Sequence, residues 1–424
     1  MPATAPAIRH KLTGICPPAR GAVIDHLTRA HPAPVWIVAA ADLRAAEELA
    51  EDTSFFHEAG GGSVPRETLV FPESMPDARD LREAVAASND RLTVLSRLRA
   101  TRSTSSQVSA LSSQLFILTT PAALLQPVPA IEEFASREFT LARGQKQSFH
   151  GLLERLQQLD YDSEAVCEAP GHYAIRGGIV DIYPVTASEP FRLDFFGDEI
   201  EEIRAFDPVT QRSGASVESI SIAASSRVKL DPSRTGIADY VTPHAHLVFV
   251  EPAALEATFA PAALAPLLEK CAAAFALSDL DEASVLFDGA ADDVTWDTES
   301  LASHRSYPED ALVARERLQV EEEARARFLH QVATWKSEGF AIAFVVTKDG
   351  EEQRIREILD ENPQRAPIAP RFLRGNLNEG FRITFRDGAG IDVARAFQPM
   401  ISPQNDTGSK ARATPEFRGL VVVT

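Results

Sequence analysis

The sequence predicts an α/β fold: a parallel-sheet domain that is split by a small α+β insert and followed by a further small α/β domain. Three observations lead to this prediction. Strand and helix patterns alternate over roughly the first 130 residues, as they do in parallel sheets with crossover helices. From about residue 138 to 226, short strands separated by Gly-Gly and Asp-Pro turns replace that pattern. Alternating strands and helices then resume at residue 246.

These changes of pattern place three boundaries in the chain. Residues 1–135 are predicted to form the first half of the parallel-sheet domain, 136–226 the insert, 227–310 the second half, and 311–424 the further α/β domain. A chain of 424 residues is too long for a single ordinary hydrophobic core, which agrees with this division.

The elements of the first half follow from apolar periodicity. Residues 34–40 (PVWIVAA) form an unbroken apolar run, which is typical of a strand buried on both faces. Residues 41–59 follow as a helix, because their apolar residues recur at helical spacing. By the same criteria, strands are expected at 68–73 and 114–120, and a helix at 78–100.

The insert and the segments after it are interpreted in the same way. Residues 387–414, with scattered Pro, Gly and Ser, are expected to form a loop. The chain then stops at GLVVVT, a β-branched run that would leave an apolar strand edge, so we expect the last domain to be incomplete at its C-terminus. The other expected elements are a helix at 147–159, strands at 173–175, 179–183 and 191–196, a strand at 246–250, an alanine-rich helical stretch at 252–277, a helix at 311–335, a strand at 341–346 and a helix at 350–362.

The composition limits the classes of protein to consider. With 44% hydrophobic and 24% charged residues the chain is globular, and it contains no apolar run long enough to span a bilayer. The N-terminus lacks a continuous apolar segment, so no signal peptide is predicted. Cys16, Cys167 and Cys271 lie far apart and form no C-x-x-C pair, which disfavours a disulfide framework and a zinc ribbon. We therefore expect a cytoplasmic protein without membrane contact.

The charge balance favours a protein partner. The chain carries 61 acidic and 42 basic residues, a formal net charge of −19. Because affinity for nucleic acid depends mostly on neutralising phosphates, this balance disfavours general DNA binding by these residues. His244 and His246 are potential metal ligands, but no third ligand has matching spacing, so no metal site is predicted.

Residues 12–27 (LTGICPPARGAVIDHL) follow the outline of a phosphate-binding loop, G-x-x-x-x-G-K-[ST]. After Gly14, each required position is altered: Ala19 replaces the second glycine, Arg20 the lysine and Gly21 the magnesium-binding hydroxyl residue. Two prolines inside the loop also lack the N–H groups that would cradle phosphates. The stretch is therefore interpreted as a degenerate nucleotide loop in a strand–loop–helix corner.

The predicted strand at 191–196 (FRLDFF) has two different faces. Because successive side chains of a strand point to opposite sides, its first, third and fifth residues are expected in the core. Arg192, Asp194 and Phe196 then share the other face, and an aromatic residue beside an arginine is the composition of a binding hot spot. The alternative is that a helix or loop covers Phe196 and that Arg192 pairs with Asp194.

Residues 171–213 resemble the insert domain shared by the excision-repair helicase UvrB and the transcription-repair coupling factors. The words RGGIVDIYP, FRLDFFGDEIEEIR and FDPVTQRS occur in the order and spacing of that family. The resemblance implies that the insert binds the damage-recognition ATPase UvrA and that Arg176, Arg192 and Phe196 are the UvrA-binding residues. An arginine at such a site can bind a carboxylate through two parallel hydrogen bonds.

The flanking segments NDRLTVLSRLRA, QLFILTTPAALLQ and ADYVTPHAHLVFVEPAAL resemble the parts of UvrB that precede and follow this insert, so the split domain is expected to be helicase-like. In UvrB the last segment ends in an acidic pair that holds magnesium. Here Val250 stands at the aspartate position and only Glu251 remains. Together with the degenerate loop, this leaves magnesium without protein ligands, so we predict no cofactor and no ATP hydrolysis for these residues.

The resemblance favours the N-terminal, UvrB-like region of a transcription-repair coupling factor. Such a region would be a non-catalytic adaptor that recruits UvrA to RNA polymerase stalled at DNA lesions. In complete relatives, an RNA-polymerase-binding domain and a motor that uses ATP and magnesium on double-stranded DNA are implied to follow. Two alternatives stay open: a UvrB-type ATP-dependent helicase subunit, which the degenerate loop disfavours, and a free-standing UvrA-binding regulator, which only the net charge of −19 supports.

Overall fold

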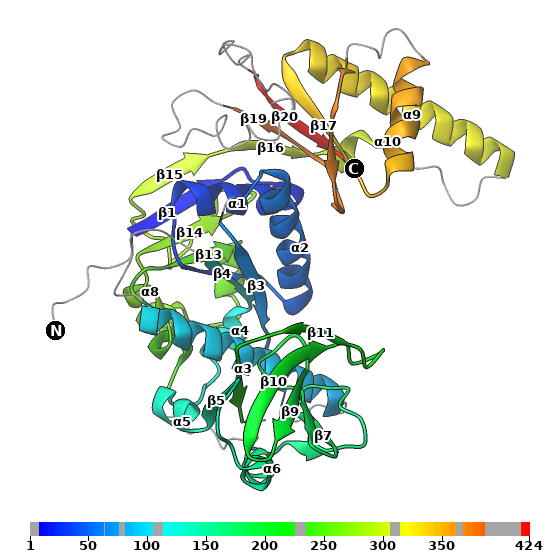
Figure 1. Ribbon diagram of the computed structural model, residues 1–424. Helices are drawn as coiled ribbons and strands as arrows, with labels where there is room; N and C mark the ends of the chain where they lie inside the picture. The colour runs from blue at the N-terminus through cyan, green and yellow to red at the C-terminus, as the bar shows by residue number, and fades with distance from the viewer. Residues whose placement is uncertain are drawn as a thin grey trace, which may run out of the picture.

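The computed structural model describes residues 8–62, 64–75, 81–104, 113–224, 235–305, 314–361, 368–385 and 417–424. In this part of the chain a central parallel sheet carries a mostly antiparallel insert on one side and a mixed sheet with two helices on another (Figure 1). The prediction of an α/β protein with a split parallel sheet is therefore confirmed.

The central sheet has seven strands in the order β15-β1-β14-β13-β2-β4-β3, and every neighbouring pair is parallel. Strands β13 and β14 follow the insert in the chain but lie between β1 and β2, so the sheet closes only when both halves of the domain come together. The strands are β1 (Ile8–Thr13), β2 (Val35–Ala39), β3 (Arg66–Phe71), β4 (Gln114–Thr119), β13 (Ala245–Val250), β14 (Ala273–Leu277) and β15 (Asp292–Thr295).

Helices cover both faces of this sheet, which explains why its strands are almost continuously apolar. Trp36 packs with residues of α1 and α2, whereas its neighbour Ile37 packs with residues of α3 and α8 on the opposite face. The helical elements of this domain are η1 (Pro17–Ala19), α1 (Arg20–Ala30), α2 (Leu43–Ala59), α3 (Leu81–Thr104), α4 (Pro121–Leu125), α5 (Ile131–Ser136), η2 (Ile237–Asp239), α7 (Pro252–Glu256), η3 (Pro261–Leu264) and α8 (Ala265–Lys270).

One expectation for this domain is wrong. The alanine-rich stretch at 252–277 was expected to be helical throughout, but its last five residues form β14, a fully buried strand between β1 and β13. Alanine favours helices in isolation, and a strand covered on both faces has no apolar–polar alternation to reveal it. The pairing with two parallel neighbours overrides the local preference.

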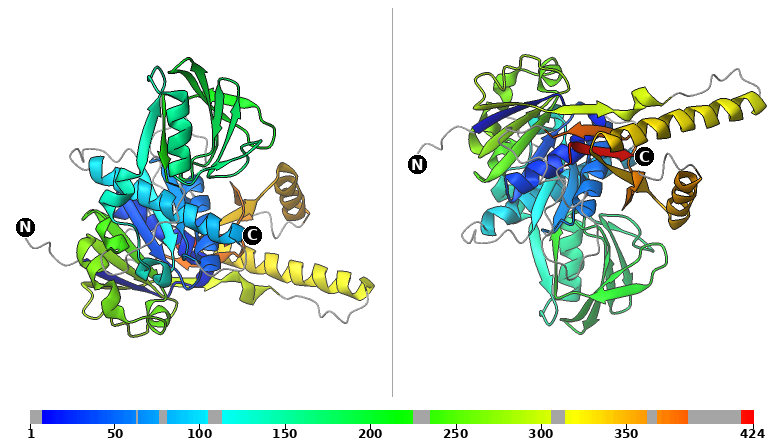
Figure 2. Two further views of the ribbon diagram at one scale, coloured as in Figure 1. Left: turned by 90° about the horizontal axis from the view of Figure 1, so that it is seen from below. Right: turned by 90° about the horizontal axis from the view of Figure 1, so that it is seen from above.

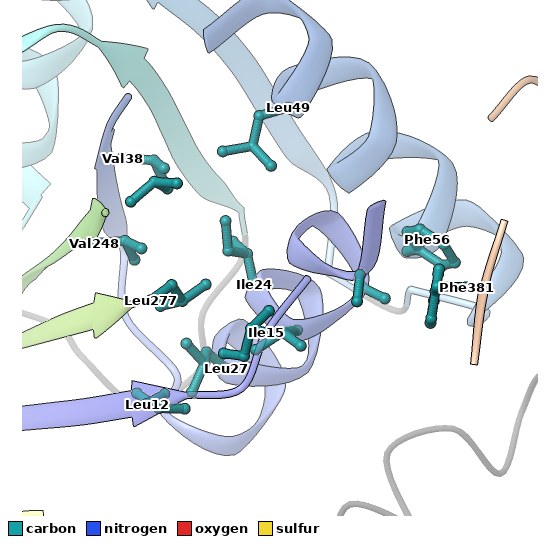
Figure 3. Packing of buried hydrophobic residues seen from close by; sticks show 14 of the residues in the cluster. Leu12, Ile15, Ile24, Leu27, Val38, Leu49, Phe56, Val248, Leu277 and Phe381 are labelled. Carbon is teal, nitrogen blue, oxygen red and sulfur yellow. The ribbon is translucent and has the colours of Figure 1, made fainter. Parts of the chain in front are cut away.

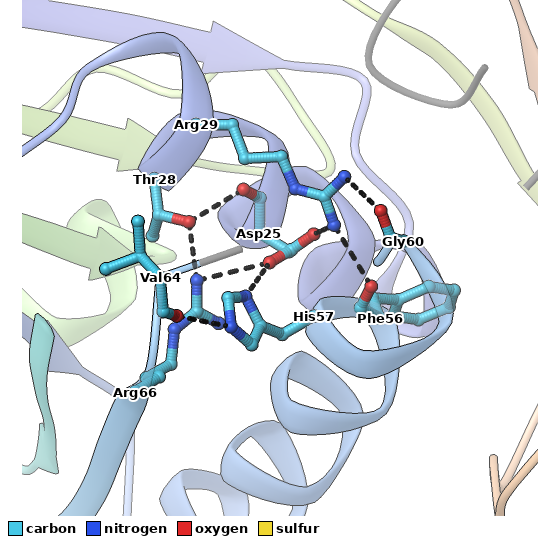
Figure 4. A network of polar contacts seen from close by, with 8 residues as sticks. All are labelled: Asp25, Thr28, Arg29, Phe56, His57, Gly60, Val64 and Arg66. Atoms are coloured by element: carbon cyan, nitrogen blue, oxygen red, sulfur yellow. Dashed lines mark hydrogen bonds and ion pairs between the residues drawn. The ribbon is translucent and has the colours of Figure 1, made fainter. Parts of the chain in front are cut away.

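A buried ionic cluster around Asp25 ties α1 and α2 to the start of β3 (Figure 4). The Asp25 carboxylate accepts a hydrogen bond from Arg66 at 3.1 Å and another from Arg29, and His57 Nδ1 lies 3.3 Å from it. The Arg66 guanidinium also lies over the Phe116 ring of β4, 5.0 Å from its centroid. Because a buried carboxylate needs such partners, the cluster holds the middle of α1 against the end of α2 and the start of β3.

The insert is a sheet of six short strands, order β11-β10-β9-β8-β7-β6, backed by one helix. A separate antiparallel ribbon, β5 with β12, brings the chain into the insert and out again. Leu152 and Leu156 of the helix pack on Val180, Leu193 and Ile203 of the sheet. The elements are β5 (Glu138–Ala142), α6 (Phe149–Gln158), β6 (Asp162–Ser163), β7 (His172–Arg176), β8 (Ile179–Ile182), β9 (Phe191–Phe196), β10 (Glu199–Phe206), β11 (Ser213–Ser216) and β12 (Ser219–Ala223).

The mixed sheet has the order β16-β19-β20-β17-β18, with α9 and α10 on one face. The GLVVVT run forms β20, the middle strand, which pairs with both β19 and β17, so the apolar edge expected there is absent from this sheet. Figure 2 shows α9 extending well beyond the sheet, and the loop expected at 387–414 lies outside the described residues. The elements are β16 (Asp297–Ser300), η4 (Leu301–His304), α9 (Ala314–Ser337), β17 (Phe340–Val346), α10 (Asp349–Asp360), β18 (Arg371–Arg374), β19 (Phe381–Thr384) and β20 (Gly419–Val423).

The mixed sheet shares a hydrophobic core with the central domain. Val421 faces α9 and α10, whereas Val422 belongs to a cluster that runs through α1 and α2 to the central sheet. Phe381 of β19 packs against Phe56 of α2, with ring centroids 5.8 Å apart, and Ile15 lies in the same cluster (Figure 3). The mixed sheet is thus seated on α1, α2 and the loop that follows β1.

Within the described ranges, no helix is long and apolar enough to cross a membrane, and no group of three or more His, Cys, Asp or Glu residues is arranged to hold a metal ion. His246, one of the two potential ligands in the sequence, is buried in β13, whereas His244 is exposed.

The burial of His246 makes the stability of the central sheet depend on pH. Its ring lies edge-on to Trp36 at 4.8 Å, and burial, with His31 and His10 nearby, lowers its pKa to about 4. The unfolded chain, with a pKa near 6.5, binds the proton first, so stability is lost as pH falls from 6.5 towards 4. We expect this histidine to lower the free energy of unfolding by about 2 kcal/mol between pH 7.5 and 5. Urea denaturation followed by tryptophan fluorescence measures the loss, and His246→Gln should remove it; an equal pH dependence in both chains contradicts the assignment.

Candidate functional site

Strand register brings the three predicted binding residues onto one face of the insert sheet. Asp181 of β8 lies opposite Arg192 of β9, and Ile179 lies opposite both Arg176 of β7 and Asp194 of β9. Paired residues point to the same side of a sheet, and so do residues two apart along a strand. Arg176, Arg192 and Phe196 therefore share the face that points away from α6.

The alternation predicted for FRLDFF agrees with the packing. Leu193 is fully buried in the insert core, and Phe191 and Phe195 pack against the same core. Phe196 is the last residue of β9, directly before a hairpin turn in which Gly197 has φ +62°. Its side chain is 79% exposed, so a large aromatic ring projects into solvent at the end of a rigid hairpin.

Arg192 is held in place by contacts with four residues. Its Nε and Nη2 donate to the two carboxylate oxygens of Asp181 at 2.7 and 2.8 Å. Its guanidinium lies 4.8 Å from the ring centroid of Phe206, and Nη1 donates to the Gln211 carbonyl at 3.4 Å and to Ser213 Oγ at 3.2 Å. Hydrogen bonding to Asp181 raises the pKa of Arg192, and Asp181 itself is fully buried. The pair is a fixed part of the sheet.

The alternative considered from the sequence is wrong in both of its parts. Asp194 pairs with Arg204 of β10, not with Arg192, and Phe196 is not covered. Sequence periodicity finds the face but not the partners, because Asp181 reaches Arg192 only through the β8–β9 pairing.

Arg176 differs from Arg192 in having no fixed ionic partner. It ends β7 beside the Gly177–Gly178 turn, is exposed, and donates from Nη2 to Gln211 Oε1 at 3.4 Å. Among the described residues no carboxylate pairs with it. Its guanidinium is therefore available to a carboxylate of a partner, for which an arginine can supply two parallel hydrogen bonds.

The loop after β1, predicted from the sequence to be a degenerate nucleotide loop, has its backbone donors satisfied by the chain itself. Gly14, at φ +72°, donates to the Asp279 carbonyl at 3.1 Å and Ile15 to the Ser278 carbonyl at 3.0 Å. Cys16 donates to Thr298 Oγ1 at 2.7 Å. The two remaining N–H groups of residues 14–20, at Ala19 and Arg20, bond within the loop, and the prolines have none.

The side chains around this loop close it further. Arg20 forms an ion pair with Glu251, whose Oε1 also accepts the Asp279 N–H at 3.0 Å. Val250 and Ala19 are buried in the hydrophobic core. A Cβ atom added at Gly21 would lie 2.7 Å from Asp52 Cβ, so a serine or threonine there would collide with α2. Arg20 and Glu251, which are predicted from the sequence to stand at the lysine and acidic positions, thus neutralise each other.

Comparison with known proteins relates the insert to a domain family and about half of the chain to named relatives. Residues 139–227 match the UvrB interaction domain family. The chain is 33% identical over 232 residues to a transcription-repair-coupling factor of Myxococcus xanthus and 27% identical over 223 residues to that of Bacillus subtilis. This chain carries a region homologous to transcription-repair-coupling factors. Each alignment covers 52% of the chain, but only 18% and 17% of the respective relative.

A shorter match reaches a higher identity: 38% over 97 residues with a transcription-repair-coupling factor of Mycobacterium bovis, or 23% of this chain and 8% of that relative. The chain therefore spans less than a fifth of the length of these three relatives. Arg176, Arg192 and Phe196 lie inside the UvrB interaction domain match, whereas the loop after β1 and Glu251 lie outside it. The binding role of the three residues stays a prediction.

The exposed and the buried members of this face should respond differently to truncation. We expect Phe196→Ala to change the free energy of unfolding of the insert by less than about 0.5 kcal/mol, since the ring packs on little. Asp181→Ala leaves Arg192 without its buried partner and should cost about 2–4 kcal/mol. Because Trp36, Trp296 and Trp335 lie outside the insert, pulse proteolysis in urea is the suitable measurement. If both variants lower the free energy of unfolding equally, the distinction between an exposed Phe196 and a structural Asp181 is wrong.

Proposed function

We propose that this chain is a non-catalytic adaptor that binds UvrA through its UvrB interaction domain. The observation that carries the proposal is the exposed Phe196, 79% accessible at the end of β9, on the same face as Arg176 and Arg192. An aromatic anchor flanked by arginines on a rigid sheet is the composition found at the centre of protein interfaces.

The proposal that the chain is non-catalytic is supported by the loop after β1. Phosphoryl transfer needs free backbone amides around the phosphates, a lysine and an acidic ligand for magnesium. In residues 14–20 every N–H already has a partner, and Arg20 is paired with Glu251. Binding of ATP and magnesium would have to break these contacts and displace Thr298, so we propose that this segment takes no cofactor.

The wider role follows from the relatives, which are named transcription-repair-coupling factors. We propose that UvrA recruited by this chain is delivered to RNA polymerase stalled at DNA lesions. Contacts with RNA polymerase and with double-stranded DNA, and a motor that uses ATP and magnesium, are assigned to the parts of the relatives that this chain does not align with. A UvrB-type helicase subunit remains the competing function, and no contact in the described residues favours it.

Binding to the cognate UvrA tests the proposal directly. We expect the chain to bind, and Phe196→Ala and Arg176→Ala each to weaken the affinity by about tenfold to a hundredfold, or about 1.4–2.7 kcal/mol. Isothermal titration calorimetry gives the affinities. Arg192→Ala is a poor test because it leaves Asp181 buried without its partner.

The matched control is Leu280→Ala, which truncates a 66% exposed side chain outside the insert and should bind as the unchanged chain does. An unchanged affinity for both Phe196→Ala and Arg176→Ala would overturn the assignment of this face.

Nucleotide chemistry supplies the second test. We expect no saturable binding of ATP with magnesium and no turnover above background, with or without Arg20→Ala, because the loop amides are already bonded. A coupled phosphate-release assay measures the turnover. Magnesium-dependent hydrolysis that Arg20→Ala abolishes would favour the helicase-subunit alternative.

A further inference from the structure

The 207–212 loop, which joins β10 to β11, is a part of the insert that the proposed function does not use. It contains most of the FDPVTQRS word that the sequence shares with the UvrB family. At its tip Val209 is 88% exposed, more than any other large hydrophobic side chain among the described residues. A single exposed valine is ordinary in itself. This valine differs because its loop is held by internal hydrogen bonds and contacts both predicted binding arginines.

The polar residues of the loop hold it in one conformation. The Asp207 carboxylate accepts the N–H groups of Val209 at 2.7 Å and Thr210 at 3.0 Å. Hydrogen bonds from Thr210 and Val209 lower the pKa of this carboxyl group. The Asp207 N–H donates to the Arg212 carbonyl at 3.0 Å, and the Gln211 N–H donates to the Asp207 carbonyl at 2.8 Å. Gln211 Nε2 also donates to the Pro208 carbonyl at 2.7 Å. The valine is therefore presented on a pre-organised support, which reduces the entropy lost on binding.

The loop is attached to both predicted binding arginines. Gln211 accepts from Arg176 through its side-chain oxygen and from Arg192 through its carbonyl, each at 3.4 Å. Along the strands, Phe196 lies at the hairpin end of β9, whereas the loop leaves β10 at the opposite end. The register places the two arginines between these ends, so Phe196 and Val209 flank them. Carboxylates on the same face are paired with Arg192 and Arg204, which leaves Arg176 as its arginine without a carboxylate partner among the described residues.

We propose that the 207–212 loop is a second contact element of the partner face and that Val209 enters an apolar pocket of UvrA. Arg176 and the exposed Arg212 have no carboxylate partner among the residues the structure describes, although the chain as a whole has a net charge of −19. The partner surface that fits is thus acidic at its centre, with one apolar pocket for Phe196 and another for Val209. The identity of the partner rests on the proposed function; the location of the contact rests on the loop itself.

Titration of the full chain with the cognate UvrA tests this. Val209→Ser should weaken binding by about threefold to tenfold, and Val209→Asp by more than tenfold, because the aspartate would bury an unpaired carboxylate in the apolar pocket. Val285→Ser, at a valine that is 69% exposed outside the insert, is the matched control and should bind normally. Asp207→Ala should weaken binding several-fold, whereas Asp207→Asn, which can still accept both N–H groups, should stay within about twofold.

The outcomes separate the two proposals. If the unchanged chain does not bind UvrA, the proposed function fails. If it binds and Phe196→Ala weakens binding while both Val209 variants stay within about twofold, the loop is not a contact element and this inference alone is overturned. It is also overturned if the chain dimerises in sedimentation velocity and Val209→Asp abolishes the dimer but leaves UvrA binding intact, because a second copy is then the occupant of the loop.

Discussion

The hydrogen bonding of the loop after β1 is the constraint on which the arrangement of this chain depends. Buried backbone donors must be paired, and here Gly14, Ile15 and Cys16 donate to Asp279, Ser278 and Thr298. Because these partners come from the chain itself, the loop can be buried, and the mixed sheet can sit on it with Phe381 against Phe56. A loop with amides free for phosphates would need an open space at this place. The loop after β1 can therefore support the mixed sheet or bind a nucleotide, but not both.

The insert is built on a different principle. The β5–β12 ribbon connects the insert to the central domain. The insert has its own hydrophobic core under α6, and its polar groups lie on the sheet face that points away from α6. On that face the buried Arg192–Asp181 pair and the bonds of Gln211 give a rigid platform, from which Phe196 projects. Rigid support and exposed anchors are what a binding surface requires. The chain thus separates a closed domain from an insert with an accessible face, on which we propose the binding site.

Much of this could be predicted from sequence because it follows from local periodicity. The strand at 34–40, the long helices and the two faces of FRLDFF are set by residues close in the chain. β14 was missed because an alanine-rich strand buried on both faces carries no local signal. The partner of Arg192 could not be predicted from periodicity because it depends on the register between β8 and β9. One signal was available: the Gly177–Gly178 turn indicates that β7 pairs with β8, the strand that carries Asp181. The contact of Cys16 with Thr298 joins residues 282 positions apart, which no window of sequence contains.

Hydrogen–deuterium exchange on the full chain, alone, with ATP and magnesium, and with UvrA, tests the central claim most directly. Amides of residues 14–20 should be protected in the free chain and unchanged by nucleotide, since they are already bonded. UvrA should add protection at residues 173–182 and 191–213 of the UvrB interaction domain. New protection of residues 14–20 by ATP and magnesium, or protection by UvrA confined to residues outside the insert, would contradict the account.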